Sequence, residues 1–112
     1  MTLAGKAAIA GIGQTRFGRG LVPSERELAC IAIDAALKDA AIDPAEVDGL
    51  SCYTLEATRD FDLVRDLGLG PIHFLAQVSH GGGAGPGTVG MGAMAIATGQ
   101  ARVVRDFVAT AF

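Results

Sequence analysis

The residues best suited to chemistry stand in the run His80-Gly81-Gly82-Gly83, which follows a short apolar segment. A strand that leads through a glycine-rich turn into a helix brings backbone N–H groups together on a bound group. Such donors stabilise negative charge on an oxygen atom. His80 adds an imidazole that could act as a further donor. The alternative is that it only bonds the backbone of its own loop. We therefore expect any binding site between His80 and Thr88, with His80, Gly81, Gly82 and Gly83 as the candidate substrate-binding residues.

The same run is similar to the oxyanion-hole loop of esterases and lipases. In that class a serine within a G-x-S-x-G motif sits on a strained strand-to-helix turn and attacks the substrate. The chain contains no such motif. A serine-hydrolase fragment therefore stays an alternative, in which the nucleophile would have to follow Phe112.

Two glycine patterns near the N-terminus do not form phosphate sites. Gly11-Ile12-Gly13 resembles a dinucleotide fingerprint, but Arg16 stands where the third glycine is required. The next helix also starts only at Ser24, so its N-terminus cannot face a pyrophosphate. Residues 13–20 have the glycine spacing of a P-loop, but Arg19 stands in place of lysine. Nucleotide binding is therefore not expected here.

Two cysteines, Cys30 and Cys52, are too few for a disulfide framework and do not have the spacing of a metal site. We expect both to be buried, reduced thiols, and we assign no metal ligands. Cys52 does not open a helix, so nothing predicts a stabilised thiolate. Tyr53 and His73 fall in expected strands and are interpreted as core or sheet-edge residues.

The composition restricts the class of protein. The chain has 112 residues, which is one domain with one modest core. Half of the residues are hydrophobic, so an intrinsically disordered chain is excluded. The net charge is −3, and nine scattered Lys and Arg residues provide no basic face, which argues against nucleic acid as a partner.

Membrane insertion and export are not expected either. The most apolar stretch, residues 78–101, is interrupted by His80, Pro86 and several glycines. Residues 1–13 lack the order of regions that defines a signal peptide. We therefore expect no membrane span and a cytoplasmic location.

Short apolar runs alternate with helical patterns along the chain, which is typical of an α/β fold. Ser24 and Glu27 form a capping box for the first helix, Asp43 caps a single turn, and Gly68 and Gly99 end the later helices. The expected strands are 6–12, 50–55 and 71–78, and the expected helical segments are 24–40, 44–47, 60–67 and 88–98.

The last helix is unusual because it presents only small or apolar residues on every side, including Gly90 and Gly92. Each glycine costs about 1 kcal/mol relative to alanine in a helix, so the helix needs a compensating reason to form. A helix without a polar face is expected to be enclosed, and small residues allow close packing.

Three segments, 6–19, 24–50 and 80–104, resemble in this order the N-terminal part of the thiolase superfamily. The resemblance is strongest to the branch of thiolase-like lipid-transfer proteins and acetyl-CoA acetyltransferases that includes steroid side-chain aldolases. It implies a partial βαβαβ unit of a two-repeat fold. Residues 1–112 would then be one truncated N-terminal domain, family-like to about residue 104, with an atypical tail at 105–112.

The resemblance also implies function. Members act on acyl-CoA thioesters as substrates, without a bound cofactor, and assemble as homodimers or with a partner subunit. The nucleophilic cysteine of true thiolases falls near Gly82 here, and a glycine argues against an acyl-enzyme. The aldolase branch implies instead retro-aldol cleavage of a CoA thioester side chain. His80 and the N–H groups of Gly81, Gly82 and Gly83 would then bind and polarise the thioester.

Two departures from the family leave alternatives open. The later catalytic motifs are missing, so this chain by itself is expected to be inactive. Arg105-Asp106 also suits a buried strand poorly, which favours a truncated or shifted reading frame near Val104 over an exposed edge strand. An isolated unit should leave an apolar patch uncovered and therefore associate. A non-catalytic binding or assembly module is the corresponding alternative.

Overall fold

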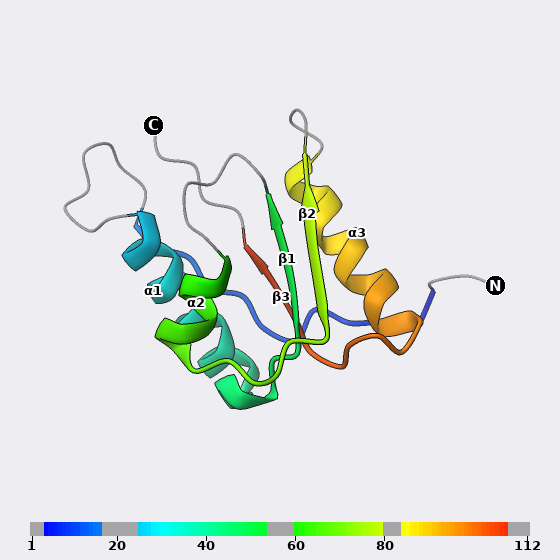
Figure 1. Ribbon diagram of the computed structural model, residues 1–112, viewed down its shortest axis with the longest axis horizontal. Coiled ribbons are helices and arrows are strands. Elements are labelled where there is room, and N and C mark those ends of the chain that lie inside the picture. Colours follow the sequence, from blue (N-terminus) through cyan, green and yellow to red (C-terminus); the bar gives the residue numbers. More distant parts are fainter. Residues whose placement is uncertain (1–3, 17–24, 54–59, 80–83, 108–112) are drawn as a thin grey trace.

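The computed structural model describes residues 4–16, 25–53, 60–79 and 84–107. In these ranges the chain forms an α/β fold, as the sequence predicts (Figure 1). Its sheet has the order β2-β1-β3, and both pairings are parallel. The elements are α1 (Glu25–Ala40), the 3-10 turn η1 (Pro44–Glu46), β1 (Gly49–Tyr53), α2 (Asp60–Leu67), β2 (Phe74–Val78), α3 (Ala84–Ala97) and β3 (Val104–Phe107).

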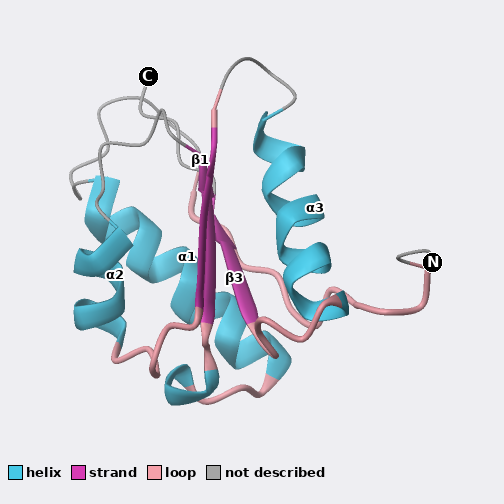
Figure 2. Cartoon of the chain, turned by 45° about the vertical axis from the view of Figure 1, so that its right-hand side comes forward, coloured by secondary structure: helices cyan, strands magenta, loops and turns pink. Residues whose placement is uncertain are grey.

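The helices cover the two faces of the sheet unequally. Among the helices of the described ranges, Figure 2 shows α1 and α2 on one side of the strands and α3 on the other. Strand β1 lies in the middle and is buried along its whole length. In α1, Ala29, Ile33 and Leu37 recur every four residues and so share one face, which packs into the core. The buried core cluster consists of Ala29, Ile33, Leu37, Val47, Leu50, Cys52, Leu63 and Leu69.

Within the described residues, each of the three α-helices ends in a Schellman motif, with one residue in the left-handed conformation. Gly68 has φ +65° after α2 and Gly99 has φ +77° after α3, which confirms both predicted C-caps. After α1 the same position is held by Ala41, with φ +56°, while the N–H of Ile42 donates to the carbonyl of Leu37. Alanine bears a steric cost in this conformation that glycine does not.

The carboxylate of Asp48 joins the beginnings of β1 and β3. It accepts hydrogen bonds from the backbone N–H groups of Arg102, at 2.9 Å, and Val103, at 3.0 Å. The carbonyl of Asp48 also accepts from the N–H of His73 at 2.7 Å, just before β2. One residue therefore aligns the amino ends of the described strands.

The prediction of a strand at residues 6–12 is wrong. Residues 7–16 have no regular structure, and Ile9 and Ile12 are 75% and 76% exposed. A strand needs a neighbour to pair with, and the described sheet provides none for this segment. Instead it lies along α1, where a Cβ on Gly13 would come within 2.1 Å of the carbonyl oxygen of Ala32.

Two expected strand boundaries also change. The second expected strand begins one residue earlier, at Gly49, and the third begins only at Phe74. Ser24, residues 54–55 and residues 108–112 lie outside the described residues, so the capping serine and the end of the tail stay predictions.

The expectation that Arg105 and Asp106 would disfavour a strand is wrong. β3 forms at one edge of the described sheet, with Leu50 of β1 in register with Arg105. Arg105 is only 6% exposed. Backbone pairing to β1 decides the conformation here, because it depends on the peptide groups and not on the side chains.

Candidate functional site

The candidate site lies at the edge of the sheet where β1 and β2 end and α3 begins, at the top in Figure 1. Ligands of open parallel α/β sheets bind at the carboxyl ends of the strands. The predicted residues His80, Gly81, Gly82 and Gly83 lie between the last residues of β2 and the start of α3, outside the described residues. Their role stays a prediction, and the structure describes the elements on either side of them.

Two buried hydroxyl groups fix the first turns of α3 on β1. The Ser51 Oγ donates to the carbonyl of Thr88 at 2.8 Å, and the Thr88 Oγ1 donates to the carbonyl of Gly85 at 2.7 Å. Both side chains are completely buried. Gly87 lies over β2, where a Cβ would meet the Val78 Cγ1 at 3.3 Å. The N-terminal half of α3 is therefore held closely against the ends of both strands.

The first turn of α3 has no acidic residue. The first N–H groups of any helix lack partners within that helix, and they carry its partial positive charge. No carboxylate from α3 itself competes for these donors, and Pro86 in this turn supplies none.

The prediction that residues 88–98 form a helix is confirmed, since α3 covers all but the last of them. Enclosure on every side is not observed within this chain. Thr88, Gly92 and Ala95 face the sheet and are buried, whereas Val89 and Met94 are 43% and 42% exposed. Some apolar side chains of α3 are therefore left uncovered within this chain, and the expected association through an apolar patch stays a prediction.

Of the remaining sequence candidates, Tyr53 lies at this same edge, whereas His73 lies at the opposite edge, where the strands begin. Tyr53 is buried at the end of β1, as expected. His73 precedes β2, has a side chain that is 64% exposed, and places its Nδ1 3.9 Å from the Asp48 Oδ2, so its assignment to a strand is wrong. Cys52 is a buried thiol, as expected, whereas the expectation of burial is wrong for Cys30, which is a half-buried thiol.

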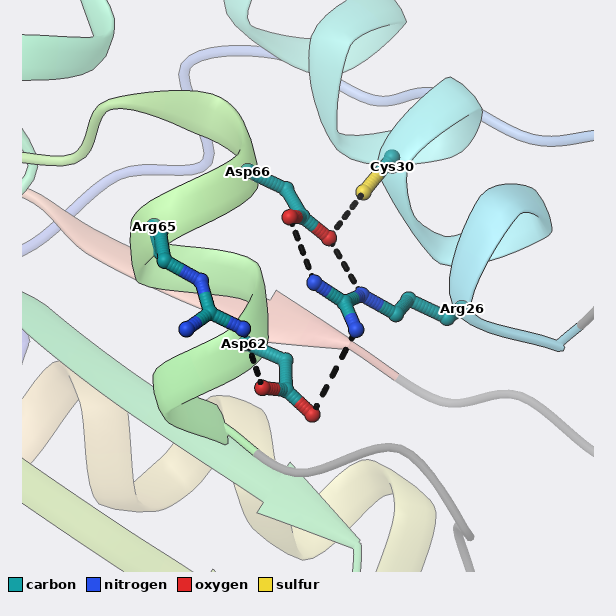
Figure 3. Close-up of polar contacts among 5 residues, drawn as sticks. All are labelled: Arg26, Cys30, Asp62, Arg65 and Asp66. Atoms are coloured by element: carbon teal, nitrogen blue, oxygen red, sulfur yellow. Dashed lines mark hydrogen bonds and ion pairs between the residues drawn. The ribbon is translucent and has the colours of Figure 1, made fainter.

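The structure also reveals a charged cluster that sequence reasoning missed. Arg26 on α1 bonds Asp66 on α2 through its Nε and, at 2.6 Å, through its Nη2 (Figure 3). Its Nη1 lies 3.7 Å from Asp62, which also pairs with Arg65 at 3.1 Å. The Cys30 Sγ donates to Asp66 at 3.9 Å. The partners from the two helices are about forty positions apart, so no local pattern in the sequence could have found them.

The electrostatics of this cluster do not favour catalysis. The hydrogen bond from Arg26 lowers the pKa of Asp66. Partial burial, followed by the nearby Asp66 carboxylate, raises the pKa of Cys30. A raised pKa keeps the thiol protonated and therefore poorly nucleophilic. The cluster is best described as an ion-pair link between α1 and α2.

Within the described ranges, the chain has neither a cluster suited to a metal ion nor a helix suited to span a membrane. No group of three or more His, Cys, Asp or Glu side chains is placed to hold a metal ion. The helices of the same ranges are too short, or insufficiently apolar, to cross a membrane.

Solved structures define the class of fold. A chain of the Ltp2-ChsH2(DUF35) aldolase superposes with a TM-score of 0.88 at 47% identity, over 92% of this chain and 27% of that one. A monomeric SCP2-thiolase-like protein of Mycobacterium smegmatis gives 0.69 at 27% identity, over 86% and 21%. The priming β-ketosynthase of the R1128 polyketide pathway gives 0.61 at 22% identity, over 72% and 26%, and shows the fold alone. This chain therefore has part of a thiolase-like fold.

Two curated relatives have names that specify a reaction as well as a fold. A steroid side-chain-cleaving aldolase of Thermomonospora curvata is 47% identical over 102 residues. The 17-hydroxy-3-oxo-4-pregnene-20-carboxyl-CoA lyase of Mycobacterium tuberculosis is 43% identical over 102 residues. Each match covers 91% of this chain and 26% of the relative, so the chain spans about a quarter of their length. No family model matches the chain.

Proposed function

We propose that this chain handles CoA thioesters in the retro-aldol cleavage of steroid side chains. The observation that carries the proposal is the identity of 43–47% to two curated enzymes whose names specify steroid side-chain cleavage and a carboxyl-CoA lyase. The thiolase-like fold supports it. The N-terminus of α3, whose first turn has no acidic residue, lies at the carboxyl edge of the sheet, which is where parallel α/β sheets bind ligands. His80, Gly81, Gly82 and Gly83 are the proposed thioester-binding residues.

The chemistry of the reaction explains why such a site is useful. A base removes the proton of the β-hydroxyl group, the Cα–Cβ bond breaks, and the hydroxyl-bearing carbon becomes a ketone. The electron pair of that bond passes into the thioester as an enolate, which then takes up a proton at Cα. Negative charge develops on the thioester oxygen, where N–H donors stabilise it. No covalent acyl-enzyme forms, so glycine near position 82 is compatible with the reaction.

We further propose that the chain works together with a partner subunit. The structural relative with a TM-score of 0.88 is an aldolase named for two components, Ltp2 and ChsH2(DUF35). Val89 and Met94 on α3 are exposed in this chain, which is consistent with further protein packing against this helix. A homodimer is the competing assembly, and the mass of the complex in solution decides between them.

The proposal is tested by incubating the chain, alone and with a candidate partner, with a steroid β-hydroxyacyl-CoA thioester and separating the products by mass spectrometry. A steroid ketone together with a shortened acyl-CoA supports the aldolase. Free CoA or a covalent acyl adduct would indicate ordinary thiolase chemistry instead. Binding without turnover by the chain alone agrees with its expected inactivity by itself, whereas the same result in the presence of the partner would identify a non-catalytic module. Labelling by a fluorophosphonate would identify a serine hydrolase.

A further inference from the structure

We draw no further inference here: the strongest candidate, the exposed apolar surface patch at Ile9 and Ile12 in the segment that lies along α1, carries nothing because nothing in the described part of the chain shows what covers it.

Discussion

The two faces of the sheet differ in how completely this chain covers them. On one face, α1 and α2 bury apolar side chains such as Ile33 and Leu63 and place the Arg26–Asp66 ion pair on the outside. On the other face lies α3 (Figure 2). This helix has no charged residue, and its Val89 and Met94 remain exposed. The comparison indicates that the main core cluster lies on the first face, whereas the second face is left partly open.

The largest expected effect is in the core of the first face. Leu63→Ala removes a completely buried side chain and should lower the free energy of unfolding by about 2–5 kcal/mol. Met94→Ala is the matched change on the open face and should cost less than about 1 kcal/mol, since much of that side chain is already exposed. Urea unfolding monitored by circular dichroism measures both. Equal losses would remove the distinction between the faces.

The next largest effect concerns the edge of the sheet at which the strands begin, where Asp48 bonds the backbone ahead of β3. Asp48→Ala removes the acceptor of the Arg102 and Val103 N–H groups and should cost about 1–3 kcal/mol. Asp43→Ala, which removes only the bond to the Ala45 N–H at the start of η1, should cost about 1 kcal/mol. The urea midpoints of the two variants give the comparison. A smaller loss for Asp48→Ala than for Asp43→Ala would show that β3 does not need this carboxylate.

A smaller pair of changes compares the helix ends on the two faces. Ala41→Gly should stabilise the chain by about 0.5–1 kcal/mol, because φ is +56° there and glycine adopts it without strain. Gly99→Ala after α3 should destabilise the chain by about 1 kcal/mol, because alanine is strained at φ +77°. The backbone conformation is the whole cause, since a Cβ there would meet nothing within 4 Å. Differential scanning calorimetry measures the shifts in Tm. A lower Tm for Ala41→Gly would contradict the account.

The smallest effect is the pH dependence of the exposed ion pair. Arg26 lowers the pKa of Asp66, so the pair stabilises the fold above the ordinary carboxyl pKa. That contribution is lost as the pH falls through the lowered folded-state pKa. The wild type should therefore be slightly more stable than Asp66→Asn at pH 7, and this difference should vanish at acidic pH. The difference at pH 7 should also shrink at high salt. An advantage that persists in acid would show that charge is not its source.

The sequence was most informative where a feature depends on neighbouring residues. The helix over 60–67, the cap at Asp43 and the turns at Gly68 and Gly99 all agree with the structure, because each depends on local backbone chemistry. Ala41 was missed because alanine is rarely found in the left-handed conformation.

Features that depend on distant pairing were predicted less well. Residues 6–12 have the pattern of a strand without a described neighbour, and β3 forms despite Arg105 because β1 pairs with it. The bond between Ser51 and Thr88 joins residues 37 positions apart and has no local signature. The thioester-binding role of residues 80–83 comes from the family resemblance and stays a prediction.

Amide hydrogen exchange with and without a steroid β-hydroxyacyl-CoA thioester tests the central claim most directly. If the thioester binds at the amino end of α3, added ligand should slow exchange in a peptide covering residues 79–90 and leave peptides from α1 and α2 unchanged. Ligand-dependent protection confined to α1 and α2, or no protection anywhere at saturating thioester, would contradict the account.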